Sequence, residues 1–164
     1  MPMSIQDTLL LGCAYARESS YREALGCLRR VLASYERDFV GEIPAKLLSY
    51  FGLSLAMEEE RINEAVVYCT RAIKKDPYQS DFYVNLARVH LHVGRRSEAV
   101  RVLEKGLRID NRDPGILLEL QELGVRRKPV LGFLGRGNPV NKVLGKFVKR
   151  FGSRRRKESP TLSL

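Results

Sequence analysis

Apolar residues recur at intervals of three and four along the first three quarters of the chain, which is the spacing of one helix face. In the first run, Leu11 and Tyr15 precede the pair Ser19-Ser20, and Ala24 and Leu28 follow it. This run predicts a helix, a tight turn and a second helix. Two further runs, beginning near residues 45 and 80, have the same arrangement. The pattern therefore predicts an all-α chain built from three helix pairs.

A small residue also recurs at a fixed place in each predicted pair. A Gly or Ala in the first helix is followed by an Ala twelve or thirteen residues later, and the later alanines lie 41 and 34 residues apart. These intervals are typical of helical-hairpin repeats. Small facing residues let two helix backbones approach closely, and a bulky replacement should wedge them apart at a cost of about 1–3 kcal/mol. The facing pairs are Gly12/Ala24, Gly52/Ala65 and Ala87/Ala99.

Two connections are longer than the repeat requires. The extra residue between Gly52 and Ala65 is assigned to a solvated turn made by the three glutamates at 58–60, because a loop tolerates an insertion. The longer first interval is assigned to residues 35–44, which predict a lengthened helix and then a loop containing Gly41.

Proline and aspartate mark where later helices begin and end. Pro77 ends the second repeat, and Ser80 or Asp81 is expected to cap the next helix. Asp113 is expected to cap a last helix at 114–124 that begins with Pro114. This capping helix would cover the apolar face that the third pair otherwise exposes.

The three runs resemble the tetratricopeptide repeat. The motifs that carry the resemblance are Leu11-Gly12-x-x-Tyr15, Phe51-Gly52-x-x-Leu55 and Tyr83-x-x-Leu86-Ala87-x-x-His90. The resemblance implies an α-α superhelix over residues 5–125, with repeats at about 5–38, 45–78 and 80–113 before the capping helix. The segment at 128–141 is also similar to the end of small bacterial tetratricopeptide proteins without an assigned function, so a bacterial protein is expected.

The net charge of +10 is confined to the end of the chain. Residues 1–125 carry 17 Lys and Arg against 18 Asp and Glu, whereas residues 126–164 carry 12 against Glu158 alone. Such asymmetry indicates a folded body with an appended interaction segment. An apolar stripe beside lysines predicts a basic amphipathic helix at about 139–151. Eleven of these twelve cations, all except Arg136, are the predicted interaction residues of this tail: Arg126, Arg127, Lys128, Lys142, Lys146, Lys149, Arg150, Arg154, Arg155, Arg156 and Lys157.

Three interpretations of this basic tail remain open. Its apolar stripe would pack on the helix pairs, or lie on an anionic membrane surface to which each nearby cation contributes about 1 kcal/mol. Alternatively, its cations would bind nucleic acid with a steep salt dependence. No apolar run is long enough for a membrane span, so the protein is expected in the cytoplasm, with a peripheral place at the inner membrane surface as the alternative.

No constellation of residues indicates an enzyme, a metal or a cofactor. His90 and His92 point in different directions on a helix, and His90 is expected to replace a core Tyr. The glycine-rich segment at 132–137 lacks the strand and helix that a nucleotide site requires. The three cysteines show neither zinc nor disulfide spacing and are expected to act as small apolar residues. They are Cys13, Cys27 and Cys69.

The resemblance implies instead a concave groove lined by the first helix of each pair, and a non-catalytic role as an adaptor or assembly scaffold. Its apolar residues, together with Arg17, Lys46 and Arg88, would suit a protein or peptide segment with apolar anchors and some negative charge. The family's two-carboxylate clamp is not reproduced, because Cys13, Leu53 and Arg88 stand where clamp residues would be expected. The predicted groove residues are Gln6, Leu9, Cys13, Arg17, Lys46, Ser49, Leu53, Met57, Asp81, Val84, Arg88 and His92.

Overall fold

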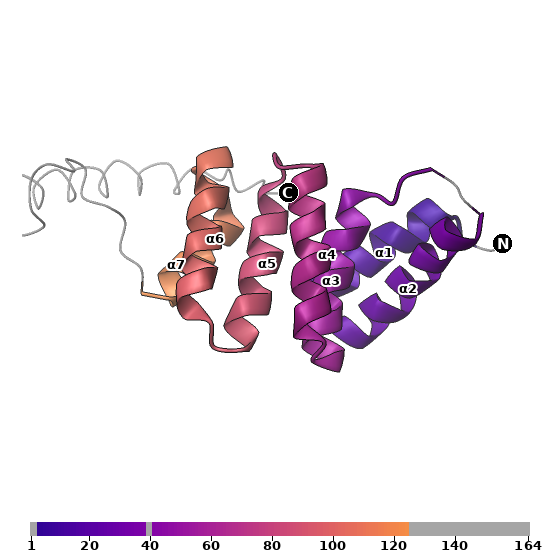
Figure 1. Ribbon diagram of the computed structural model, residues 1–164, viewed down its shortest axis with the longest axis horizontal. Helices are drawn as coiled ribbons and strands as arrows, with labels where there is room; N and C mark the ends of the chain where they lie inside the picture. The colour runs from indigo at the N-terminus through magenta and orange to yellow at the C-terminus, as the bar shows by residue number, and fades with distance from the viewer. Residues whose placement is uncertain (1–2, 39–40, 125–164) are drawn as a thin grey trace, which may run out of the picture. The chain divides into compact units, whose positions relative to one another are not determined.

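A computed structural model of the chain describes residues 3–38 and 41–124 (Figure 1). The predicted basic tail and its amphipathic helix lie outside these residues. The described part contains helices and no strands, so the all-α prediction is confirmed there. The helices are α1 (Ile5–Arg17), α2 (Tyr21–Asp38), α3 (Ala45–Glu59), α4 (Ile62–Lys75), α5 (Ser80–His92), α6 (Arg96–Ile109) and α7 (Pro114–Glu122).

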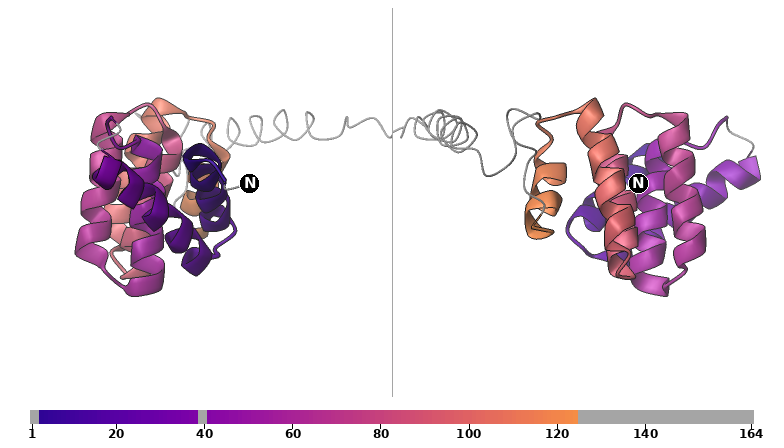
Figure 2. Two further views of the ribbon diagram at one scale, coloured as in Figure 1. Left: turned by 90° about the vertical axis from the view of Figure 1, so that its right-hand side faces the viewer. Right: turned by 60° about the vertical axis from the view of Figure 1, so that its left-hand side comes forward.

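The helices form three hairpins in chain order, α1/α2, α3/α4 and α5/α6, and α7 packs against α5 and α6 (Figures 1 and 2). They belong to one compact unit that ends at Gly124. In Figure 1, α1 and α2 are inclined to the nearly parallel helices α3–α6. None of the helices in the described residues is both long and apolar enough to cross a membrane.

Helix α3 is at the centre of the stack, because it contacts α1, α2, α4 and α5. Every residue from Leu47 to Ala56 is buried. Its sequence is apolar or small on nearly all sides, as expected of a helix enclosed by others. The inward faces of the outer helices supply the rest of the core, including Leu28 from α2 and Leu103 from α6.

Close helix approach follows the predicted pattern at Gly52. A Cβ at this position would lie 2.8 Å from the Ala65 carbonyl oxygen and 2.8 Å from Cys69 Sγ. At Gly12 the nearest neighbours are Leu28 and Cys27, not the predicted Ala24. The closest approach of the first hairpin at Gly12 is therefore to Leu28, one helical turn after Ala24 on α2.

Sequence reasoning missed a further close approach at Gly106. A Cβ there would lie 2.6 Å from Ile116 Cδ1 and 2.9 Å from Tyr83 Cβ. The glycine thus lets α6 pack against both α5 and α7. Gly106 is not part of a predicted small-residue pair, because the residues that it contacts come from two helices, α5 and α7.

The turn after α3 differs from the prediction. Glu58 and Glu59 belong to the last turn of α3, and only Glu60 takes a left-handed conformation, with φ of 55°. The first two glutamates form ion pairs with Arg22 (2.8 Å) and Arg29 (2.7 Å) of α2. The extra residue of the second repeat is therefore accommodated in a longer helix that is tied to the first hairpin.

The cap of α5 was also wrongly predicted. Gln79 is its N-cap residue and makes no side-chain capping bond, while Ser80 is the first helical residue. The Ser80 hydroxyl instead donates to Asp113 Oδ2 at 2.6 Å. Asp113 does cap α7, accepting the Ile116 N–H at 2.8 Å, and Pro114 follows it as predicted. One aspartate thus joins the starts of α5 and α7.

Candidate interaction site

Five of the predicted groove residues are buried in the core and present no surface to a partner. They come from α1, α3 and α5, and their side chains pack between neighbouring helices because α3 is enclosed on several sides. The five residues are Leu9, Cys13, Ser49, Leu53 and Val84. This burial corrects the prediction that they line an open groove.

The other seven are exposed or half-buried on the surface formed by α1, α3 and α5, which we call the first-helix face. They are Gln6, Arg17, Lys46, Met57, Asp81, Arg88 and His92. Three of the seven, Arg17, Lys46 and Asp81, gather around one place where the three helices meet. Met57 packs against the core, and Arg88 lies elsewhere on α5.

The meeting place is organised by the Asp81 carboxylate. Its Oδ2 atom accepts the Tyr50 hydroxyl at 2.9 Å and an Arg17 guanidinium N–H at 3.4 Å. The same guanidinium lies over the Tyr50 ring, 5.1 Å from its centroid, which is a cation–π geometry. We call Arg17, Tyr50 and Asp81 the polar node. It connects α1, α3 and α5 through residues up to 64 positions apart.

Burial keeps the Tyr50 hydroxyl and the Cys13 thiol of this site protonated. Burial, followed by the Asp81 charge, raises the pKa of Tyr50, so its phenol remains a donor at neutral pH. Burial also raises the pKa of Cys13 to about 11, although Lys46 and Arg17 oppose the shift. The Cys13 thiol is therefore protonated and is a poor nucleophile.

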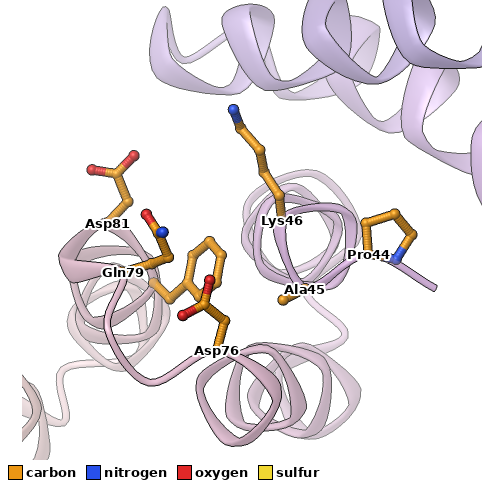
Figure 3. A pocket seen from close by; sticks show the side chains of 7 residues that line it. Pro44, Ala45, Lys46, Asp76, Gln79 and Asp81 are labelled. Atoms are coloured by element: carbon orange, nitrogen blue, oxygen red, sulfur yellow. The ribbon is translucent and has the colours of Figure 1, made fainter. Parts of the chain in front are cut away.

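A shallow pocket of about 350 Å³ lies beside the polar node (Figure 3). Lys46 of α3 and Asp81 of α5 extend toward the same side of it. Lys46 lines this pocket and takes part in none of the ion pairs of the described residues. The lining residues are Pro44, Ala45, Lys46, Asp76, Gln79, Asp81 and Phe82.

Arg88, a predicted groove residue, forms an ion pair with the capping helix α7. Its Nε atom lies 2.6 Å from Glu119 Oε1 of α7, and the Glu119 side chain is only 9% exposed. The guanidinium therefore neutralises a buried carboxylate of the capping helix. Within the described chain, this pairing makes Arg88 a structural cation rather than one available to a ligand.

The histidines of α5 do not form a site. In the described residues, no group of three His, Cys, Asp or Glu side chains could hold a metal ion. His92 is exposed, and His90 is half-buried with its Nδ1 atom unpaired. Burial, followed by the charge of Arg95, lowers the pKa of His90.

Sequence reasoning missed Tyr50 and Glu119, the two groups that hold the predicted cations. Both lie among apolar residues of the sequence, and such a stretch predicts a buried helix face without indicating a polar contact. The available signal was chemical: a buried tyrosine hydroxyl or carboxylate requires a polar partner. The partner could not be named because it comes from another helix.

Residues 56–120 match the tetratricopeptide repeat family. Among curated proteins, no sequence matches the chain significantly. Among solved structures, the second tetratricopeptide domain of human RPAP3, in complex with an HSP70 peptide, has a TM-score of 0.54 at 19% identity. That alignment covers 75% of this chain and 100% of the other.

Two more structures have the same fold. The first tetratricopeptide domain of Spaghetti (RPAP3), bound to an HSP90 peptide, has a TM-score of 0.54 at 15% identity, with 73% of this chain and 90% of that chain covered. The protein MamA has a TM-score of 0.54 at 19% identity, with 94% and 80% covered. The chain therefore contains tetratricopeptide repeats, recognised directly over residues 56–120, on a scaffold with the tetratricopeptide fold.

Proposed function

We propose that this chain is a non-catalytic protein-interaction module that binds a segment of a partner protein on its first-helix face. The observation that carries the proposal is the convergence of Lys46 with the polar node at the pocket between α3 and α5. The half-buried Met57 and the exposed His92 would add contacts farther along the same face. Tetratricopeptide domains of similar fold bind short peptides, as the two RPAP3 structures illustrate.

The chaperone peptides of those structures are not proposed as ligands here. The likeness to those domains is one of fold alone. Cys13 and Leu53 are buried and Arg88 is paired with Glu119, although these three positions are where clamp residues are expected. A partner of this chain would therefore be recognised by different groups, among them Lys46, a cation of the first-helix face that makes no ion pair within the described residues.

The proposal is tested by selecting peptides from a displayed random library on the full chain and measuring their affinities by fluorescence anisotropy. Lys46→Glu should weaken the selected peptides at least about tenfold, since it reverses a charge at the pocket (about 1.4 kcal/mol). Lys74→Glu, at an exposed position of α4, is the matched control and should change the affinity less than twofold. Equal effects of the two changes would place binding away from the first-helix face.

The charge distribution supports a second candidate function for residues 126–164. Their 12 basic residues against one acidic residue would attach the domain to an anionic membrane surface or to nucleic acid. The test compares the full chain with a chain ending at Val125, using sedimentation with anionic vesicles and DNA retardation at increasing salt. Salt-sensitive binding by the full chain alone would support this role, and loss of stability without loss of binding would refute it.

A further inference from the structure

The second helix of each hairpin is more basic than the other helices. Lys and Arg outnumber Asp and Glu by four to three in α2, by three to one in α4 and by four to two in α6. Helices α1, α3, α5 and α7 together carry three basic residues against six acidic ones. Residues 1–125 are nearly neutral as a whole, but their helices are therefore polarised, with the positive charge on the second helices.

The contacts between helices leave one side of each second helix uncovered. Helices α1, α3, α5 and α7 pack against one another in succession, whereas α2, α4 and α6 make no contacts with one another within the described residues. Helix α5 contacts both α4 and α6 and lies between them in Figure 1. The basic helices thus form an outer layer over the first helices.

The outer side of α4 carries exposed apolar residues. Its buried residues recur at intervals of four and three and pack on the core: Ala65, Cys69 and Ala72. Val67, Arg71 and Lys74 have the same spacing and lie on the opposite side of the helix. Tyr78 follows in the turn after α4. Val67 and Tyr78 are 56% and 78% exposed, more than any other large apolar side chain of the described residues.

The cations on this side of α4 are not neutralised by neighbouring groups. Helix α4 has no acidic residue between positions 65 and 75. Lys75 pairs with Glu42 at 2.6 Å, whereas Arg71 and Lys74 take part in none of the ion pairs of the described residues. Two unpaired cations therefore lie between the two most exposed apolar side chains in the sequence order of this segment.

The acidic residues at either end of this segment are already engaged. Glu64 pairs with Arg61 at 2.6 Å. Asp76 lines the pocket between α3 and α5, and its Oδ1 atom accepts the Tyr78 N–H at 3.2 Å. Neither carboxylate is therefore free to neutralise the cations of α4.

Helix α6 has a similar but weaker arrangement. Arg101, Lys105 and Arg108 recur at intervals of four and three, and Glu104 lies among them. These three cations also form no ion pair in the part of the chain that the structure describes. Helix α6 thus extends the basic surface, but the combination with strongly exposed apolar residues belongs to α4.

Apolar side chains beside cations favour a lipid surface over nucleic acid. Proteins that bind single strands stack the bases on aromatic rings or arginine planes, and Val67 offers no such plane. At an anionic membrane, exposed apolar groups enter the headgroup boundary while nearby cations are attracted to the lipid charge. Tyrosine is enriched at this boundary, and the long side chains of Arg71 and Lys74 can reach the lipid phosphates.

We propose that the outer side of α4 binds the headgroup layer of an anionic membrane through Val67, Arg71, Lys74 and Tyr78, which we call the α4 patch. This inference rests on the second candidate function, attachment through residues 126–164, and adds to it a surface of the folded helices. The first-helix face would stay free for a partner protein, because the α4 patch lies on the side of α4 that turns away from the core.

The test uses the full chain with one introduced tryptophan, since the natural sequence has none. The variant Tyr78→Trp is mixed with vesicles of equal parts phosphatidylserine and acyl-brominated phosphatidylcholine. Its emission should shift to shorter wavelength and lose about half its intensity, because apolar groups of such a surface lie about 5–10 Å into the boundary. The control is Leu118→Trp on α7, which does not contact α4 and where the native side chain is 52% exposed. Its emission should not change when the same fraction of protein is bound.

A charge variant tests the cations of the α4 patch. Arg71→Gln combined with Lys74→Gln should weaken vesicle binding of the full chain at least about tenfold, since each cation near an anionic surface is worth about fivefold in affinity. The matched control combines Arg22→Gln with Arg29→Gln, which removes two cations of α2 that are paired with glutamates of α3. It lowers the net charge equally and should weaken binding less than about twofold. Equal weakening by the two double variants would overturn the proposal.

The remaining outcomes separate this inference from the second candidate function. Vesicle binding without quenching of Tyr78→Trp would overturn the α4 patch and leave attachment through residues 126–164 in place. A full chain that does not sediment with anionic vesicles would refute membrane attachment itself. Loss of DNA retardation in the Arg71/Lys74 variant as large as its loss of vesicle binding would also overturn the proposal, because the surface would then bind polyanions of any kind.

Discussion

Gly52 and Gly26 allow one substitution to be tested in two opposite environments. Both lie inside helices, α3 and α2. A Cβ at Gly52 would meet the Ala65 carbonyl oxygen at 2.8 Å, whereas a Cβ at Gly26 would meet nothing within 4 Å. Alanine at either place should gain helix propensity of about 0.8–1 kcal/mol. Only at Gly52 must that gain be set against a clash.

The clash should decide the sign at Gly52. Overpacking costs about 1–3 kcal/mol, and the upper part of this range applies because a backbone oxygen of α4 cannot rotate away as a side chain could. We therefore expect Gly52→Ala to destabilise the protein by about 1–2 kcal/mol net, and Gly26→Ala to stabilise it by up to about 1 kcal/mol. Each kcal/mol corresponds to roughly 4 °C in Tm for a domain of this size.

The assay is urea unfolding followed by circular dichroism at the helix band, with Tm as a second measure. Opposite shifts of the two variants from the wild-type midpoint would support the close-approach explanation. A Gly52→Ala protein as stable as the wild type would refute it, because α3 and α4 would then have room to separate. Parallel gains in both variants would show that helix propensity alone governs these positions.

Three further predictions follow from buried polar groups. Because burial lowers the pKa of His90 below its ordinary 6.5, the unfolded chain binds the proton more readily, and stability should fall as the pH drops below about 6.5. The variant His90→Tyr should show a smaller decrease in the urea unfolding midpoint between pH 7.5 and pH 5.5 than the wild type. An equal decrease in the two proteins would refute this prediction. Arg88→Met should cost about 1–3 kcal/mol in urea unfolding by leaving Glu119 buried and unpaired, and adding Glu119→Gln should recover part of it; no recovery would show that the packing of Arg88 matters instead. Burial raises the pKa of Cys69 to about 12 and that of Cys13 to about 11. Both thiols should therefore resist iodoacetamide in the native protein and react with it once the protein is unfolded in urea. Rapid labelling of either cysteine in the native protein, located by mass spectrometry, would contradict this prediction.

The sequence was most informative where a structural feature depends on neighbouring residues of one helix or one turn. Apolar spacing predicted the helix pairs, and Asp113-Pro114 predicted the start of α7 because capping involves only the next few residues. The same reasoning wrongly placed Glu58 and Glu59 in a turn. They belong to the end of α3, where they form ion pairs with arginines of α2 that are distant in the sequence. It also could not tell that Gly12 meets Leu28 rather than Ala24.

The candidate site shows the same division more sharply. The family pattern identified Arg17, Lys46 and Asp81 as residues of the first helices, and the structure brings these three together. Which side chains are exposed, and which cation is already paired, depends on how α1, α3, α5 and α7 stack. Burial and ion pairing are properties of atoms from different helices, so periodicity along one helix cannot determine them.

The sequence by itself therefore determined the helix pairs, their repeat and the charge difference between residues 1–125 and 126–164, since these depend on local spacing and composition. Only the tertiary structure decided that Leu53 belongs to the core, that Arg88 neutralises Glu119 and that Asp81 occupies the polar node. The physical reason is that a hydrogen bond or an ion pair requires a separation of a few ångströms. The relative placement of the helices sets that separation for residues distant in the chain.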